Sequence, residues 1–452
     1  MDRVHIGNGC GFWGDNLDAP VVLAEQGRLD YLTLEYLAEL TMSILALQKQ
    51  RDPKAGFATD FLDVLKRLAP VLKAQPTLKI VTNAGGMNPD SCAEQARAIL
   101  GEAQLSDWVI ATVSGDDLLP RLDRLIDAGH PFTNLETGEP LAVIRSRVVS
   151  ANAYLGAPGI VAALEQGASV VITGRVADAS LTLAPAVWEL GWEWQDWDRL
   201  SAATMAGHLI ECGAQATGGL WCNWREADDM AAVGYPVVEI ETDGTFCLTK
   251  PPNSGGAVNC ETASEQLLYE VGDPADYLTP DVRADFTSVQ LTQTAPDTVQ
   301  VTAARGKPAT DTYKVSIAYR DGFMASGGLV LLGPEATVKA RKCGQIFVQR
   351  LRRAGVELAH INIECLGQGD CVPGVVSATA EPPEVVLRIT AHDPRRHAIE
   401  RFTKEFAPLV TAGLPGVTGY TTGRPPVREV FAFWPALISK SAVKWETRIH
   451  GR

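Results

Sequence analysis

The sequence predicts an α/β protein with an N-terminal domain of repeated βαβ units around a mostly parallel sheet, followed by a smaller α+β domain. Over the first 180 residues, short apolar strands alternate with amphipathic helices, which is the pattern of βαβ units. Beyond about residue 285, several strands accompany only two helices, so the second domain should carry its helices on one face of a sheet. We therefore assign residues 1–284 to the first domain and residues 285–452 to the second.

The elements of the first domain follow from apolar runs bounded by glycine and polar residues. Strands are expected at residues 4–6, 31–35, 78–82, 108–113, 144–150 and 169–173. Helices are expected between them at residues 17–26, 36–50, 61–73, 91–100, 118–128 and 156–165. A largely helical insertion then covers residues 181–235 and contains six tryptophans: Trp188, Trp192, Trp194, Trp197, Trp221 and Trp224. These side chains suit either packing at a domain or subunit surface or an apolar wall for a lipid-like substrate.

A Pro/Gly-rich break at residues 251–256 separates the later elements. A strand is expected before it at residues 245–250 and a helix after it at residues 260–271. In the second domain, strands are expected at residues 298–303, 312–319, 360–365, 384–390 and 427–433, and helices at residues 335–354 and 394–412. Residues 320–321 should form a hairpin turn.

The composition indicates a compact, cytoplasmic protein. Of the 452 residues, 46% are hydrophobic and 21% are charged, which is ordinary for a globular protein. The net charge of −14 argues against nucleic acid or an anionic membrane as the main partner, because both repel an acidic surface. No apolar run reaches the roughly 18–20 residues that span a bilayer, and residues 1–20 lack the pattern of a secretory signal. The nine cysteines include no Cys-x-x-Cys pair, so neither a disulfide framework nor a metal site is predicted.

Polar or glycine-rich loops follow the ends of several expected strands. They are residues 9–15, Glu35, residues 83–88, residues 114–117, Asn152 and residues 174–180. In a parallel sheet, ligands bind beyond the carboxyl ends of the strands. We therefore expect these loops to converge on one site for a small, anionic molecule.

The first loop, residues 9–14, formally matches the dinucleotide-binding pattern Gly-x-Gly-x-x-Gly. Glu35, near the end of the next strand, stands where a carboxylate would bind a ribose hydroxyl. However, the Phe-Trp pair inside the loop would crowd a pyrophosphate, and Asp15 would face the same anion. Gly11 therefore belongs to a nucleotide site, to a different small-molecule pocket, or to a structural turn.

Two further loops suit an anion or a carbonyl oxygen. Asn83, Gly85 and Gly86 combine an amide side chain with backbone N–H groups that can grip an oxyanion, although a tight turn has the same composition. Arg175 can form paired hydrogen bonds to a carboxylate or phosphate beside the N-terminus of the next helix. Asp178, in the same loop, is either a site residue or a helix cap.

Two candidates lie further along the chain. His208 and Glu211 are three residues apart on one face of an expected helix, where a carboxylate can orient an imidazole for proton transfer. A solvated pair is the alternative interpretation. Lys250 adjoins a second flexible loop with Gly255 and Gly256, which would let the loop close over a phosphate or carboxylate. A surface lysine beside a turn is the alternative there.

Several longer motifs are recognisable together. They are Gly-Cys-Gly-Phe-Trp-Gly-Asp at residues 9–15, residues 30–39, Thr-Asn-Ala-Gly-Gly-Met-Asn-Pro at residues 82–89, Gly-Arg-Val-Ala-Asp-Ala-Ser-Leu at residues 174–181, residues 265–270, Asp-Pro at residues 273–274, residues 277–281 and Asp-Phe at residues 285–286. Over nearly the whole chain these motifs resemble the acyclic terpene utilisation protein family, AtuA. The resemblance implies a soluble cytoplasmic protein of the breakdown of acyclic terpenoids such as citronellol and geraniol, whose intermediates are branched acyl-CoA thioesters.

From the loops and the resemblance together, we expect an enzyme that acts on an acyl-CoA thioester by lyase, hydratase or isomerase-type acid–base chemistry, with no cofactor identified. Such chemistry needs a grip on the thioester carbonyl and a group that transfers protons. The expected catalytic residues are Asp15, Glu35, Asn83, Asp178 and His208, and the expected ligand-binding residues are Gly11, Gly85, Gly86, Arg175, Lys250, Gly255 and Gly256. The alternatives are a non-catalytic subunit of an acyl-CoA-processing complex and a nucleotide-dependent enzyme that uses residues 9–14. A homo-oligomer, most simply a dimer, is expected.

Overall fold

The computed structural model describes residues 2–375, 380–419 and 423–451. They form two compact units, a larger one of Met1–Ala318 with Phe433–Arg452 and a smaller one of Tyr319–Ala432. This division differs from the predicted boundary after residue 284. The reason is that the hairpin of β11 (Gln290–Ala295) and β12 (Thr298–Thr302) extends the main sheet of the larger unit by pairing with β8 (Phe246–Thr249).

The larger unit is built on a ten-stranded mixed sheet in the order β11-β12-β8-β7-β1-β2-β3-β6-β4-β19. Its five central strands run parallel: β1 (Arg3–Asn8), β2 (Tyr31–Leu34), β3 (Lys79–Thr82), β6 (Val170–Thr173) and β4 (Ile110–Ser114). The strands outside them, which include β7 (Val237–Glu241) and β19 (Glu446–His450), pair antiparallel. The sheet is therefore parallel in its centre only, because short hairpin connections such as β7–β8 impose antiparallel pairing.

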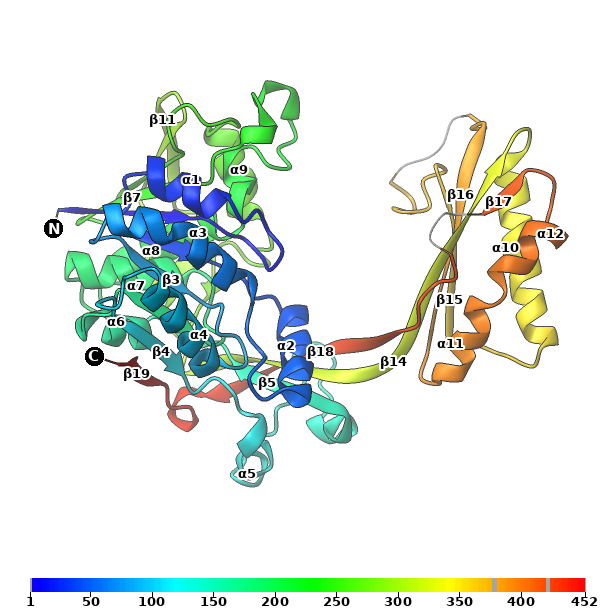
Figure 1. The fold of residues 1–452 in the computed structure, drawn as a ribbon, viewed down its shortest axis with the longest axis horizontal. Coiled ribbons are helices and arrows are strands. Elements are labelled where there is room, and N and C mark those ends of the chain that lie inside the picture. Colours follow the sequence, from blue (N-terminus) through cyan, green and yellow to red (C-terminus); the bar gives the residue numbers. More distant parts are fainter. Residues whose placement is uncertain (1, 376–379, 420–422, 452) are drawn as a thin grey trace. The chain divides into compact units, whose positions relative to one another are not determined.

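Helices cover both faces of the central strands (Figure 1). One face carries α1 (Ala19–Gln26), α3 (Asp60–Ala74) and α4 (Pro89–Glu102), and the other carries α6 (Pro158–Glu165), α7 (Ser180–Leu190) and α8 (Trp197–Glu211). Every residue of β2 and β6 is buried, as expected for parallel strands enclosed on two sides. The other elements of this unit are α2 (Glu39–Arg51), α5 (Leu122–Asp127), α9 (Cys260–Leu268), β5 (Val148–Ala153), β9 (Tyr277–Leu278), β10 (Val282–Asp285) and β13 (Arg305–Pro308).

The six tryptophans of the predicted insertion have different surroundings. Trp192 and Trp221 are buried, whereas Trp188 and Trp224 are exposed. The insertion itself is largely helical, with α7 and α8 followed by short 3-10 turns. The tryptophans therefore do not all share one environment.

The smaller unit is a sheet with helices packed on it. Strands β15 (His360–Leu366), β16 (Glu384–Asp393), β14 (Thr312–Leu332) and β17 (Val417–Gly419) lie in that order, and β18 (Arg428–Ser439) also pairs with β14. Helices α10 (Ala336–Arg353), α11 (Arg396–Thr403) and α12 (Phe406–Ala412) enclose an apolar core with alternate residues of β16, such as Leu387 and Ile389. Strands β14 and β18 each continue into the larger unit.

Three local expectations were wrong. The expected strand at residues 144–150 is β5, which pairs with β14 rather than joining the parallel strands. The expected hairpin turn at residues 320–321 lies inside the continuous strand β14, and the single helix expected at residues 394–412 is divided into α11 and α12. The pairing of β5 and the division of the helix have no local sequence signal, whereas residues 320–322, Arg-Asp-Gly, have the composition of a turn and yet continue as strand.

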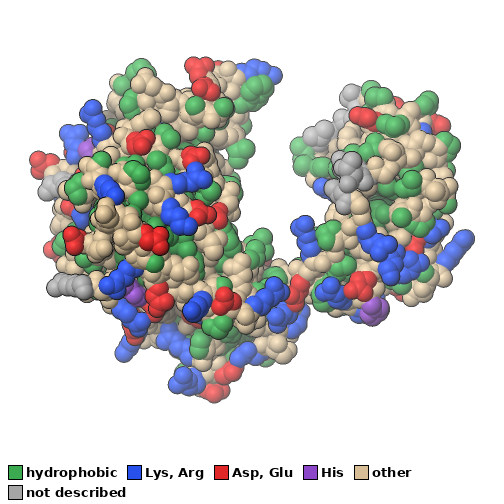
Figure 2. All heavy atoms as spheres, viewed as in Figure 1, with side chains coloured by type: hydrophobic (Ala, Val, Ile, Leu, Met, Phe, Trp, Pro, Cys, Tyr) green, Lys and Arg blue, Asp and Glu red, His purple; other side chains and the backbone are tan. Residues whose placement is uncertain are grey.

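In the parts of the chain that the structure describes, no helix is both long enough and apolar enough to cross a membrane. Figure 2 shows Lys and Arg side chains interspersed with Asp and Glu over the visible face of the larger unit.

Candidate functional site

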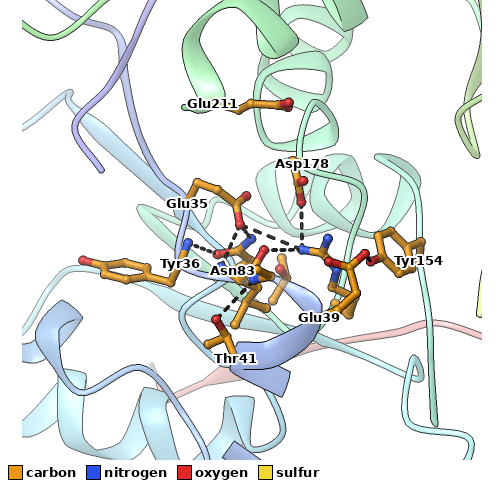
Figure 3. Close-up of polar contacts among 12 residues, drawn as sticks. Glu35, Tyr36, Glu39, Thr41, Asn83, Tyr154, Asp178 and Glu211 are labelled. Carbon is orange, nitrogen blue, oxygen red and sulfur yellow. Dashed lines mark hydrogen bonds and ion pairs between the residues drawn. The ribbon is translucent and has the colours of Figure 1, made fainter. Parts of the chain in front are cut away.

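Three strand-end residues meet at the carboxyl edge of the parallel strands. Glu35 follows β2, Asn83 follows β3 and Arg175 follows β6. All three residues are buried, with exposed fractions of 4%, 0% and 2%. Asn83 Nδ2 donates a hydrogen bond to Glu35 Oε1, and Asn83 Oδ1 accepts one from the backbone N–H of Tyr36 at 2.8 Å. Arg175 Nη1 lies 3.9 Å from Glu35 Oε1. With Asp178, these residues are named the strand-end cluster (Figure 3).

The guanidinium of Arg175 is the buried positive charge of the cluster. Its Nη1 donates to Asp178 Oδ1 at 2.7 Å and to the carbonyl oxygen of Leu37 at 2.9 Å. Its plane lies over the ring of Tyr154, 4.2 Å from the centroid. Burial by itself lowers the pKa of Arg175. The facing Asp178, Tyr154 and Glu35 raise this pKa by more than burial lowers it, so the guanidinium stays charged. Within the described residues, Arg175 Nε has no hydrogen-bond partner.

The two oxygens of Glu35 have different surroundings. Oε1 accepts hydrogen bonds from Asn83 Nδ2 and from the backbone N–H of Leu37, the latter at 2.8 Å. Oε2 is buried and finds no partner anywhere in the described chain. Loss of hydration and the nearby charge of Asp178 raise the pKa of Glu35 well above its ordinary value, against the opposing effect of Arg175. Both effects favour the un-ionised form of Glu35.

Asp178 is the accessible carboxyl of the cluster, with 32% of its side chain exposed. Partial burial raises its pKa to about 6, Arg175 opposes this shift, and the negative charges of Glu211 and Glu39 add to it. In Figure 3 the carboxylate of Asp178 points toward the guanidinium nitrogen to which it is hydrogen-bonded, and Glu211 lies above it in that view. A group with this pKa can both accept and release a proton near neutrality.

Tyr154 packs against the guanidinium of Arg175, and Glu39 is hydrogen-bonded to Tyr154. Tyr154 Oη donates to Glu39 Oε1 at 2.6 Å, and Lys314 Nζ lies 3.4 Å from the same oxygen. Neither Tyr154 nor Glu39 was predicted as a site residue. Tyr154 stands in no glycine-rich loop or recognisable motif, and Glu39 is only the last residue of the recognisable segment 30–39, which assigns it no role.

Asp116 and Asn152 hold the backbone of Arg175 in place. Asp116 Oδ2 accepts hydrogen bonds from the backbone N–H of Arg175 at 3.0 Å and from Asn152 Nδ2 at 2.8 Å. Burial raises the pKa of Asp116 to about 6, although these hydrogen bonds favour the ionised form. Both residues stand in the polar segments predicted to converge, so their position after β4 and within β5 was the available signal.

His208 is a buried residue of α8, outside the strand-end cluster. Each of its two ring nitrogens faces a hydrogen-bond acceptor. Nδ1 lies 3.0 Å from Glu211 Oε1, and Nε2 lies 2.9 Å from the carbonyl oxygen of Gln266. When both nitrogens carry hydrogen, each donates to one of these acceptors, which is the pattern of an imidazolium. Burial lowers the pKa of His208, but Glu211 and Gln266 raise it by more. In this arrangement His208 holds Glu211 in place beside Asp178 and has no ring nitrogen left to face a substrate.

The first glycine loop is filled by the protein itself. Asp15 Oδ2 accepts the backbone N–H of Gly11 at 2.8 Å, and Asp15 Oδ1 accepts the hydroxyl of Tyr235 at 2.6 Å. A Cβ atom on Gly11 would lie 2.7 Å from the carbonyl carbon of Cys212, beyond the end of α8. In a dinucleotide-binding loop, the space beside this glycine is occupied by the pyrophosphate. Here the backbone of Cys212 occupies it.

Gly11→Ala should therefore destabilise the protein in the absence of any ligand, by about 1–3 kcal/mol, because the added methyl group overlaps backbone. Urea unfolding of the unliganded protein measures this loss. Gly101→Ala in α4 is the matched control, because nothing lies within 4 Å of a Cβ atom there and alanine favours a helix. A Gly11→Ala protein of unchanged stability that loses affinity for NAD or ATP would instead support the nucleotide hypothesis.

The glycine loop at residues 83–88 is closed by backbone hydrogen bonds, within the loop and to residue 56. The N–H of Gly86 donates to the carbonyl oxygen of Asn83 at 3.1 Å, and that of Met87 donates to Gly56 at 2.8 Å. A Cβ atom on Gly85 would lie 2.5 Å from the carbonyl oxygen of Thr173. The side chain of Asn83, rather than the glycine amides, reaches the cluster.

Lys250, Gly255 and Gly256 form a separate local arrangement. Lys250 Nζ donates to the carbonyl oxygen of Ser254 at 2.7 Å and lies 3.0 Å from Asp297 Oδ2. The N–H groups of Gly255 and Gly256 donate to backbone carbonyls of the 228–232 segment, at 2.7 and 2.6 Å. The structure thus brings Glu35, Asn83, Arg175 and Asp178 together and shows these three residues holding another loop.

No group of three or more His, Cys, Asp or Glu side chains suited to a metal ion occurs among the described residues. No curated protein and no solved structure matches the chain significantly. The family model described as acyclic terpene utilisation family protein AtuA matches residues 4–449, which confirms the resemblance seen in the motifs. The match spans both compact units, and the chain belongs to the acyclic terpene utilisation family AtuA.

Proposed function

We propose that the protein is an enzyme of acyclic terpenoid or branched-chain acid breakdown, which acts on an acyl-CoA thioester by lyase, hydratase or isomerase-type acid–base chemistry. One observation carries the proposal: two carboxyl groups of different accessibility, Glu35 and Asp178, flank the single buried guanidinium of Arg175. The family supports the substrate class. The strand-end cluster supplies the groups that such a reaction needs.

The roles follow from the geometry. Asp178 is exposed enough to meet a substrate and has a pKa near the working pH, which suits proton transfer. Arg175 Nε is a buried donor without a partner in the described chain, and a carbonyl or carboxylate oxygen would satisfy it. Tyr154 and Leu37 fix the guanidinium, so its orientation exists before a ligand arrives.

The test is turnover of a panel of branched enoyl-CoA and 3-hydroxyacyl-CoA esters by the purified protein. Asp178→Asn should lower kcat/KM by about 10²–10⁴-fold, because the amide cannot accept the proton. The activity of the unmodified enzyme should fall below about pH 6, where Asp178 takes up a proton, and this limb should disappear in the variant.

Asp123→Asn is the control for the loss of one carboxylate, because Asp123 is exposed and pairs with Arg145, which is not part of the cluster. It should leave turnover unchanged. Absence of both turnover and binding with every ester would contradict the proposal.

The exposed Trp188 and Trp224 favour a second candidate, a non-catalytic subunit of an acyl-CoA-processing complex. Isolation of a stable hetero-complex whose activity needs this chain, together with inactivity of the chain alone, would support that candidate over the first.

A further inference from the structure

We propose that Glu35 works as an un-ionised carboxylic acid whose Oε2 donates a hydrogen bond to the thioester carbonyl oxygen, while Asp178 removes a proton from the adjacent carbon. The inference rests on the proposed function, because it assigns the two carboxyls of that site. The inference goes beyond the proposed function because it makes Glu35 a hydrogen-bond donor, whereas a glutamate in such a site is usually expected to be a base.

The contacts of Glu35 place its proton. Oε1 already accepts two N–H groups, from Leu37 and Asn83, so it behaves as the carbonyl-like oxygen of the acid. The hydroxyl must then be on Oε2, which has no acceptor within the described residues. A buried hydroxyl without an acceptor is costly, and a carbonyl oxygen of a ligand would satisfy it.

Charge balance explains why Glu35 keeps the proton. The charged groups that face it are Arg175 and Asp178, and the thiol of Cys10 is also within electrostatic range. Arg175 Nη1 is 2.7 Å from Asp178 but 3.9 Å from Glu35. One guanidinium cannot neutralise two adjacent carboxylates, so the closer and more exposed one, Asp178, takes the negative charge and Glu35 stays neutral. A carboxylic acid held neutral in this way can serve as a hydrogen-bond donor at neutral pH.

The proposed step is balanced. The bond between hydrogen and the carbon next to the thioester carbonyl breaks, and the proton goes to the carboxylate of Asp178. The electron pair of that bond forms a double bond to the carbonyl carbon, and the carbonyl π pair moves onto oxygen. Glu35 keeps its own proton and stabilises the resulting enolate oxygen by the hydrogen bond from Oε2.

Deuterium exchange into isovaleryl-CoA in D₂O, followed by mass spectrometry, tests this step. Glu35→Met removes the donor and should slow exchange by about 10²–10³-fold, the usual effect of losing one oxyanion donor. Glu35→Gln keeps an N–H donor at the same place, so it should retain a substantial part of the rate. If Glu35 were instead the base, Gln and Met would abolish exchange equally, and that result would overturn the proposal. Equal, unimpaired exchange in both variants would also overturn it.

Infrared spectroscopy of the unliganded protein tests the same claim without a substrate. At pH 7.5 the spectrum of the unmodified protein minus that of Glu35→Gln should show the carbonyl band of an un-ionised carboxylic acid. A carboxylate band in its place would overturn the inference. Glu35→Met serves for the same difference spectrum if Glu35→Gln does not fold. If no acyl-CoA binds or exchanges, the proposed function fails, while the infrared band still decides the state of Glu35.

Discussion

Replacing Arg175 by methionine should lower the free energy of unfolding by about 3 kcal/mol at pH 7, the lower end of the effect of breaking a buried ion pair, because Asp178 is partly exposed. The substitution leaves Asp178 without its 2.7 Å partner and the carbonyl of Leu37 without its donor, although the side-chain volume is roughly kept. Urea unfolding measures the loss. Arg145→Met is the matched control: Arg145 likewise makes two hydrogen bonds, both to the carboxylate of Asp123, but at the surface, where the expected loss is below about 1 kcal/mol.

The loss in free energy of unfolding caused by Arg175→Met should become smaller as the pH falls from 8 to 5. Without the guanidinium, the folded-state pKa values of Asp178 and Glu35 rise further above their unfolded values. The folded state then binds more protons than the unfolded state between those values, so the free energy of unfolding falls as pH rises through this window. A deficit that does not change with pH would contradict the electrostatic explanation and indicate lost packing.

Asp281→Ala should cost about 2–4 kcal/mol of stability, by leaving buried donors unpaired and opening a cavity. Asp281 is buried, and its carboxylate accepts the backbone N–H of Ala157 at 3.0 Å and the hydroxyl of Ser180 at 2.9 Å. It thereby joins the first turns of α6 and α7, which position the strand-end loops. Thermal or urea unfolding gives the loss directly.

Asp276→Ala is the control for Asp281→Ala. Asp276 makes two hydrogen bonds to Arg283 in a partly exposed pair, so its removal should cost less than about 1 kcal/mol. Asp281→Asn keeps one acceptor oxygen and should fall between the two. Equal losses for Asp281→Ala and Asp276→Ala would show that the buried bridge is no more important than a surface pair.

The central strands and the position of the cluster were predictable because both follow from short-range patterns. Continuous apolar runs such as β6 require cover on both faces, and this requirement predicts parallel strands. Once the strands are parallel, the residues after them meet at one edge, which is how Glu35, Asn83 and Arg175 come together.

Tyr154 and Glu39 were not predicted, and Glu211 was predicted only as the partner of His208, because all three reach the cluster through the tertiary fold. Tyr154 follows β5, and that strand pairs with β14, more than 150 residues later in the chain. No local pattern specifies such a partner. Gly11 illustrates the other limit: the same glycine spacing serves a pyrophosphate or, as here, the backbone beyond α8.

The insertion of the smaller unit between two parts of the larger one has a consequence for synthesis on the ribosome. Strand β19, which pairs along β4, lies in Phe433–Arg452 and is translated after the whole of Tyr319–Ala432. Throughout that interval the N–H and C=O groups of β4 on this edge have no native strand to bind, and an open edge invites pairing with other chains. The nascent protein therefore passes through a stage in which the unit begun first is still incomplete, and protection by a chaperone would be most valuable then.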